Sequence, residues 1–127
     1  MGTDTPIQYR TVSPYLVVRD AARVIAFLEG AFGGRELNRH AAEDGRIMHA
    51  EVQLGDSIVM IGESPDPGRA GEVNLQIFVE DTDASYRRAL DAGGTSEAEP
   101  ADKPYGTRMA GVADPAGNHW WIGTRWA

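Results

Sequence analysis

Hydrophobic residues recur along the chain in two spacings, and these predict strands and helices in an order that occurs twice. Residues 13–18 and 74–79 are rich in β-branched and aromatic side chains, which is typical of strands. Each run is followed by an aspartate, Asp20 or Asp81, and then by apolar residues at helical spacing up to a pair of glycines. We therefore predict that one helix begins after Asp20, that the other begins at Asp81 or Thr82, and that each ends at the glycines.

Three more strands are predicted after each helix, because the apolar segments there are separated by glycine and proline turns. Residues 63–71 hold two prolines and two glycines and are predicted to link the two halves. The chain 1–127 is then one α+β domain with two βαβββ modules in tandem, at about 12–62 and about 72–124. The predicted strands are about 35–40, 46–54 and 57–61 in the first module and about 95–100, 107–112 and 118–124 in the second.

The two modules are also related in sequence. When the chain is shifted by 61 residues, 12–63 aligns with 73–124 without a gap and gives ten identities, where unrelated sequences would give about three. The identities fall on strand residues, on the two aspartates and on glycines that end elements, so they support the predicted order. Each module is expected to place its helix on one face of a curved mixed sheet, and the free faces of two modules form a trough that suits a small ligand.

Composition narrows the range of partners. The net charge of −7 disfavours nucleic acid, whose phosphates require a basic face, and fits a cationic or neutral small molecule. The absence of cysteine excludes disulfides and thiolate metal sites. No apolar run approaches the length of about eighteen residues that spans a bilayer, so we expect a cytoplasmic protein without a membrane partner. The outer strand edges of two such sheets need to be covered by another element or chain.

Three segments carry a resemblance to a known family: PYLVVRDAARVIAFLEGAFG at 14–33, DGRIMHAEVQLGDSIVMIGE at 44–63 and YGTRMAGVADPAGNHWWIGT at 105–124. They resemble the PhnB-like branch of the vicinal oxygen chelate superfamily, which contains glyoxalase I, extradiol dioxygenases, fosfomycin-resistance enzymes and bleomycin-resistance proteins. The resemblance covers nearly the whole chain. It implies a homodimer, with the trough closed either within one chain or by modules exchanged between chains. It departs from the family pattern at Asn118, where many relatives have histidine.

The resemblance also points to the positions that hold a metal in other members, where the ligands come from the first and last strands of each module. These positions correspond to Ser13, Met60, Asn74 and Trp121, and the shift of 61 residues pairs 13 with 74 and 60 with 121. Divalent metals prefer imidazole and carboxylate, whereas hydroxyl and amide groups are weak ligands, a thioether suits soft metals and an indole has no usable lone pair. We therefore expect no metal and no other cofactor at this place.

Strand alternation identifies further side chains on the same face. We expect the even positions from Met48 to Leu54 to face the helix, which turns His49 and Glu51 toward the trough. His49 is the candidate catalytic acid or base and Glu51 the residue that orients it, because a nearby carboxylate raises the basicity of an imidazole. Alternation sends one tryptophan of the pair 120–121 to each face, and we favour Trp121 for the trough. The candidate ligand-binding residues are Ser13, Tyr15, Met60, Asn74, Gln76, Phe78, Arg108, His119 and Trp121, with Arg108 included because its strand opens onto the rim of the trough.

Three functions remain open at this point. The first is a metal-independent binding protein of the bleomycin-resistance kind that sequesters an aromatic or cationic metabolite or antibiotic. The second is a metal-independent enzyme, of the lyase or isomerase type, in which His49 moves a proton. The third is a metal-dependent glyoxalase or dioxygenase using His49, Glu51 and His119, and we rank it last because it needs ligands from strands that the family does not use.

Overall fold

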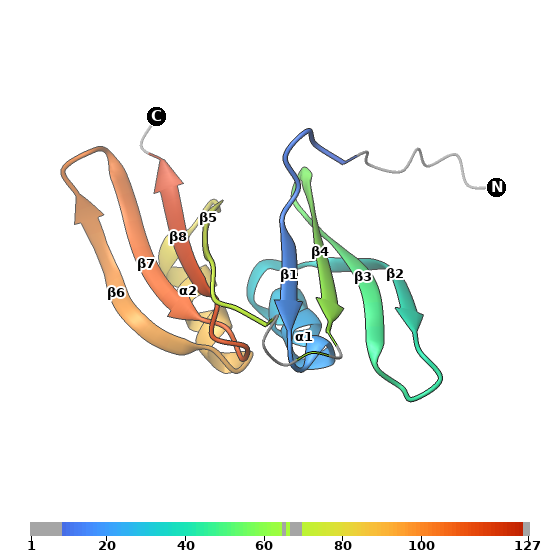
Figure 1. The fold of residues 1–127 in the computed structure, drawn as a ribbon. Coiled ribbons are helices and arrows are strands. Elements are labelled where there is room, and N and C mark those ends of the chain that lie inside the picture. Colours follow the sequence, from blue (N-terminus) through green and yellow to red (C-terminus); the bar gives the residue numbers. More distant parts are fainter. Residues whose placement is uncertain (1–8, 65, 67–69, 126–127) are drawn as a thin grey trace.

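The computed structural model describes residues 9–64, 66 and 70–125, which form two βαβββ modules in tandem (Figure 1). The elements follow the predicted order, so the α+β class and the tandem arrangement are confirmed. No helix in this described part is long and apolar enough to cross a membrane. The first module contains β1 (Tyr15–Val18), α1 (Ala21–Phe32), β2 (Arg35–Ala41), β3 (Ile47–Leu54) and β4 (Ser57–Glu63), and the second contains β5 (Asn74–Phe78), α2 (Thr82–Asp91), β6 (Thr95–Lys103), β7 (Thr107–Ala113) and β8 (His119–Arg125).

Each module forms its own four-stranded mixed sheet. The strand orders are β1-β4-β3-β2 and β5-β8-β7-β6, with the first pair parallel in each sheet and the other pairs antiparallel. β1 and β5 are therefore edge strands, and they lie where the two sheets meet, with α1 and α2 on the same side of the sheets (Figure 1). Within the described residues no hydrogen-bond ladder joins the sheets, so the predicted curved sheet is divided into two.

Both helices begin at the predicted aspartates. The Asp20 side chain accepts a hydrogen bond from the backbone N–H of Arg23, and the Asp81 side chain accepts one from Ala84. These bonds satisfy backbone donors that the first turn of a helix leaves without partners. α1 ends at Gly33, whose φ of 67° is the left-handed conformation that glycine adopts without steric cost.

A shared core on the helix side holds the two modules together. The rings of Phe32 on α1 and Trp120 on β8 lie 5.4 Å apart between centroids, although they belong to different modules. A side chain at Gly94 would place its Cβ 2.9 Å from Cε1 of Phe27, and one at Gly30 would lie 2.9 Å from Cβ of Ala92. Two glycines therefore allow α1 to approach the second module closely.

The core side of β3 differs from the prediction at one position. Ala50, Val52 and Leu54 are buried as expected. Met48, however, is 51% exposed, and Ile47, which is 5% exposed, occupies the core in its place. At this end of β3 the pairing with β2 shifts by one residue: His40 pairs with His49, but the next residue, Ala41, pairs with Ile47, so Met48 is left without a partner in the register. Such a bulge reverses the side-chain alternation locally, and the expectation that Met48 faces the helix is therefore wrong.

The internal repeat holds in the structure with one change of register. Met60 on β4 and Trp121 on β8 are related by the shift of 61 residues, but their neighbours on the next strand are Glu51 and Gly111. The gapless alignment would pair Glu51 with Val112, which is buried in the core. Glu51 and Gly111 are therefore the equivalent positions of the two modules.

Candidate functional site

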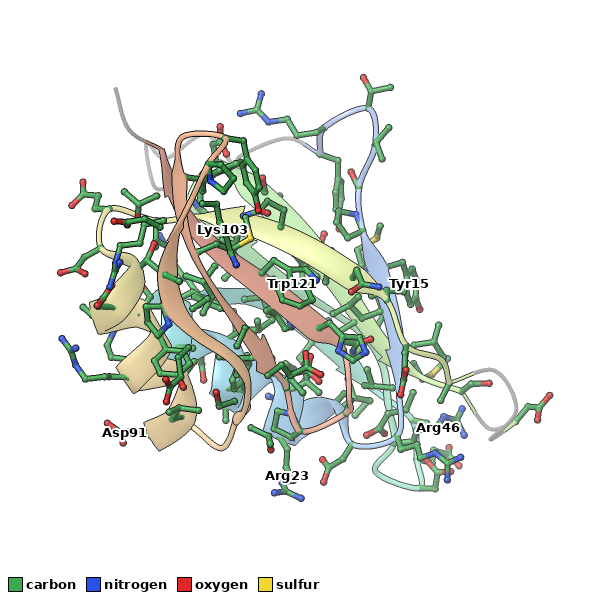
Figure 2. All side chains as sticks on the ribbon, turned by 90° about the vertical axis from the view of Figure 1, so that its left-hand side faces the viewer. Tyr15, Arg23, Arg46, Asp91, Lys103 and Trp121 are labelled. Atoms are coloured by element: carbon green, nitrogen blue, oxygen red, sulfur yellow. The ribbon has the colours of Figure 1, made fainter. Side chains whose placement is uncertain are left out.

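The two neighbouring tryptophans of β8 lie on opposite faces of the second sheet. Trp120 is 2% exposed, and its Nε1 donates a hydrogen bond of 2.9 Å to Oδ2 of Asp114. Trp121 is half-buried and points to the other side, together with Tyr15 of β1 (Figure 2). Trp120 is thus the core residue and Trp121 the residue on the free side, as predicted. We call this side of the sheets, away from both helices, the open face. From the strand register and alternation it carries Tyr15, His49, Glu51, Met60, Asn74, Gln76, Phe78, His119 and Trp121.

The Trp121 indole is fixed by two neighbours. Its Nε1 donates a hydrogen bond of 2.9 Å to Oδ1 of Asn74 on β5. A Cβ atom on Gly111 would lie 2.5 Å from Cζ3 and 2.9 Å from Cε3 of the indole, so the ring lies against the backbone of β7. Glycine is the residue that leaves room for it there. The indole is held in one orientation with part of its surface accessible, which is what stacking with another planar ring requires.

Two further side chains of β5 complete this region. Gln76 donates from Nε2 to the backbone oxygen of Trp121 at 2.9 Å and to that of Ile77 at 3.4 Å. Phe78 is 49% exposed, and its Cε1 lies 3.6 Å from the place that a Cβ on Gly123 would occupy. The predicted residues Asn74, Gln76, Phe78 and Trp121 are thus brought together on one sheet.

His119 forms the strongest polar cluster on the open face. Its Nδ1 lies 2.7 and 2.9 Å from the two carboxylate oxygens of Glu97, and its Nε2 lies 3.4 Å from Oε2 of Glu72. Hydrogen bonding to Glu97 first, and to Glu72 second, raises the pKa of His119 above 6.5 because both carboxylates stabilise the imidazolium. Neither glutamate was predicted, since Glu97 lies at a register shift of β6 that strand alternation does not reveal.

The candidate catalytic pair lies on the first sheet. His49 packs against the Tyr15 ring, edge to face with 5.9 Å between centroids, and against His40 of β2 at 6.4 Å. Glu51 is two residues further along β3, and both side chains are half-buried. The hydrogen bonds of the described residues do not include one between His49 and Glu51. A catalytic role for the pair therefore stays a prediction, and His40 is a neighbour that the prediction lacked.

Arg108 lies on the opposite side from the one expected. Its guanidinium donates to both carboxylate oxygens of Asp83 on α2, at 2.6 and 2.9 Å, and to Oδ1 of Asp102 at 3.0 Å. This contact lowers the pKa of Asp83. On β7, Gly111 is paired with Trp121 and therefore lies on the open face. Alternation places Arg108 on the opposite face, together with the buried Ala110, which is the side of the helices. The expectation that Arg108 opens onto the trough is wrong, because α2 supplies its partner.

A cavity of about 800 Å³ lies between the modules, along the free edge of β5. One wall contains Gln76 and Phe78 of the open face, and others come from Phe32, Trp120 and the segment 54–59 that joins β3 and β4. Its volume is within the range of sites that take drug-sized molecules. Because β5 is an edge strand, its side chains border both the open face and this cavity.

The known proteins that share this geometry identify the family. The model of the Glyoxalase/Bleomycin resistance protein/Dioxygenase superfamily matches residues 9–122. The chain belongs to this superfamily. It is 38% identical over 123 residues to the uncharacterized protein Rv0887c of Mycobacterium tuberculosis (strain ATCC 25618 / H37Rv), and the match covers 88% of this chain and 72% of that protein.

Solved structures of other proteins have the same fold. TioX from Micromonospora sp. ML1 is 28% identical with a TM-score of 0.73, over 93% of this chain and 98% of that one. TnmS3 from Streptomyces sp. CB03234, an antibiotic binding protein, is 19% identical with a TM-score of 0.71, over 99% and 100%. The fold and the resemblance expected from the sequence are thereby confirmed.

The metal of other superfamily members does not fit the residues at the corresponding positions here. In the second module, the amide oxygen of Asn74 already accepts the indole N–H, and Trp121 has no lone pair to offer. In the first, Ser13 donates from Oγ to the backbone oxygen of Arg10 at 2.7 Å, and Met60 offers a thioether. The described residues also contain no group of three His, Cys, Asp or Glu side chains arranged to hold an ion. These donors suit hydrogen bonding and stacking.

Proposed function

We propose that this protein binds a planar aromatic small molecule, a metabolite or an antibiotic, on the open face without a metal. The observation that carries the proposal is the fixed indole of Trp121, which is held by Asn74 and Gly111 with part of its ring accessible. A side chain that is already immobilised loses little rotamer freedom when a ligand stacks on it. An offset-stacked or edge-to-face ring contributes about 0.5–1.5 kcal/mol beyond its buried area.

The cavity beside β5 supports binding of a molecule larger than one ring system. Gln76 and Phe78 belong to the open face and also line the cavity, so a ligand that extends from Trp121 past these two side chains would enter the cavity. Burial of apolar surface there contributes about 25 cal/mol for each Å² removed from water. The surroundings are acidic, with Glu51, Glu72 and Glu97 on or beside the open face, which favours a neutral or cationic ligand over an anion.

The structural neighbours are consistent with this kind of function. TnmS3, which has the same fold, is described as an antibiotic binding protein. The enzymatic alternative has less support, since the contacts of His49 are with the rings of Tyr15 and His40. We further propose a cytoplasmic homodimer that has no nucleic-acid or membrane partner, on the grounds of its acidic charge and its exposed edge strands.

The test uses calorimetric titration with two cationic aromatic probes, bleomycin and proflavine. Replacement of Trp121 by alanine is expected to weaken binding about tenfold, equivalent to about 1.4 kcal/mol. The matched control is Tyr105→Ala, which removes an exposed aromatic ring from the turn between β6 and β7 and should leave affinity unchanged. Equal affinities of the wild type and Trp121→Ala for every probe that binds would overturn the proposal, and so would failure of both probes to bind.

Metal independence is tested on the same samples. Elemental analysis should find no stoichiometric transition metal, and treatment with a chelator should leave probe affinity unchanged, because the four family positions hold weak ligands. Loss of binding on chelation, restored by one added divalent metal, would contradict this part of the proposal.

A further inference from the structure

The two amides of β5 next to Trp121 have orientations that their partners dictate. The oxygen and nitrogen of a carboxamide have almost the same shape, so their assignment follows from the hydrogen bonds they make. The indole Nε1–H of Trp121 can only donate. Asn74 therefore has to turn Oδ1 toward the indole, at 2.9 Å, and its Nδ2 group points elsewhere.

The same argument fixes the side-chain amide of Gln76, but here the nitrogen rather than the oxygen faces the partner. A backbone carbonyl can only accept, and Gln76 lies within 2.9 Å of the Trp121 oxygen and 3.4 Å of the Ile77 oxygen. Gln76 therefore has to turn Nε2 toward these oxygens, which leaves Oε1 on the other side. Exchange of the two atoms of either amide would bring donor to donor or acceptor to acceptor.

Each amide thus keeps one group for a ligand. Asn74 and Gln76 are both exposed, and none of the hydrogen bonds within the described residues uses Nδ2 of Asn74 or Oε1 of Gln76. Two residues apart on one strand, they share a face at a Cα separation of about 6.5–7 Å. The open face therefore presents one donor and one acceptor side by side, next to the Trp121 indole that Asn74 helps to fix.

We propose that the aromatic ligand carries a cyclic amide edge, as in a lactam or an imide fused to a planar ring. Its carbonyl oxygen accepts from Nδ2 of Asn74, and its N–H donates to Oε1 of Gln76, while the ring stacks on Trp121. This inference rests on the proposed function, because it names the chemical class of the molecule that the open face binds. A planar ring without such an edge makes the stacking contact alone.

Binding of three ring systems of nearly equal size tests the inference. Quinolin-2(1H)-one has both the carbonyl and the N–H, 1-methylquinolin-2-one has the carbonyl only, and naphthalene has neither. Each hydrogen bond contributes about 1 kcal/mol, so we expect loss of the N–H to weaken binding about fivefold and loss of both groups to weaken it about 25-fold. Calorimetry or ligand-observed NMR measures the three dissociation constants.

One variant separates the donor from the indole contact. Asn74→Asp keeps an oxygen for the indole N–H and removes the Nδ2 group, so quinolin-2(1H)-one should bind about fivefold more weakly while naphthalene is unaffected. An unchanged NMR signal of the Trp121 indole N–H shows that the platform is intact. Asn38→Asp is the matched control, because it adds the same charge on β2 beside Glu51, at the far edge of the other sheet from Trp121, and should change neither affinity.

The outcomes distinguish this inference from the proposed function. If all three compounds bind the wild type equally and Trp121→Ala weakens all of them, the open face binds aromatic rings and the cyclic amide class is wrong. Retention of full quinolin-2(1H)-one affinity in Asn74→Asp also overturns it. If Trp121→Ala leaves every affinity unchanged, or if no compound binds at millimolar concentration, both the inference and the proposed function are overturned.

Discussion

The indole of Trp121 is placed by a residue that has no side chain. Gly111 has an ordinary backbone conformation, so its importance lies in the space above it rather than in its φ angle. The sequence predicted that Trp121 faces the ligand, from alternation with Trp120, but the role of Gly111 depends on a strand register that is one residue away from the gapless repeat. A contact between strands of this kind is not visible in the sequence.

Substitution of Gly111 by alanine is expected to displace the indole and weaken aromatic binding about tenfold, because a Cβ would lie 2.5 Å from Cζ3 of Trp121. Calorimetry with proflavine measures the change. Gly71→Ala is the control, since a Cβ at that position contacts nothing within 4 Å. Unchanged affinity in Gly111→Ala would show that the indole position does not matter for binding.

Because of His119, the free energy of unfolding should fall as the pH rises above 6.5. Its pKa in the folded protein is raised above 6.5 by Glu97 and Glu72, so its contribution to stability is complete below that pH and is lost as the pH rises through the folded value. Urea unfolding of the wild type should therefore show stability falling as the pH increases from 6.5, and the fall should be smaller in His119→Gln. Identical pH dependence in the two proteins would argue against the imidazolium cluster.

At the scale of elements, alternation along a strand was a good guide where the ladder is regular and failed where it is interrupted. On β8 it separated Trp120 from Trp121 correctly. On β3 a bulge placed Ile47 in the core instead of Met48, and on β6 a register shift hid the glutamate that pairs with His119. Arg108 was misplaced because its ion pair is with a helix, and only the packing of α2 on β7 shows which side that is.

The two tryptophans of β8 provide a stability test at this scale. Replacement of the buried Trp120 by alanine should lower the free energy of unfolding by about 3–5 kcal/mol, because it removes a large core side chain and its hydrogen bond to Asp114. The same replacement of half-buried Trp121 should cost about 1 kcal/mol or less. Urea denaturation measures both, and equal losses would contradict the assignment of the two residues to opposite faces.

For the whole molecule, the tandem fold could be predicted from the sequence, but the way its halves are joined could not. The predictable part comes from local signals: strand-forming runs, aspartate caps and glycine turns at matching positions. The junction depends instead on close approaches between residues far apart in the chain, such as Gly94 with Phe27 and Gly30 with Ala92. These contacts, rather than a shared sheet, hold the two modules in register.

Gly94 should therefore tolerate no larger residue. A Cβ there would lie 2.5 Å from Cγ1 of Val112, 2.8 Å from the backbone oxygen of Ala89 and 2.9 Å from Cε1 of Phe27. Overpacking of this kind costs about 1–3 kcal/mol, so Gly94→Ala should lower the midpoint of urea unfolding clearly, whereas Gly71→Ala should not. A stability equal to that of the wild type would mean that Val112, Ala89 and Phe27 are not packed this closely around Gly94.

The equivalence of Glu51 and Gly111 has a consequence for the direction in which a ligand lies. Two identical modules would present a face with twofold pseudosymmetry, and a molecule could then bind in either of two opposite directions. Here one module has a carboxylate beside Met60, and the other has bare backbone beneath Trp121. The two ends of the open face therefore differ in chemistry. A ligand with one flat end and one hydrophilic end has a single direction in which both ends are matched.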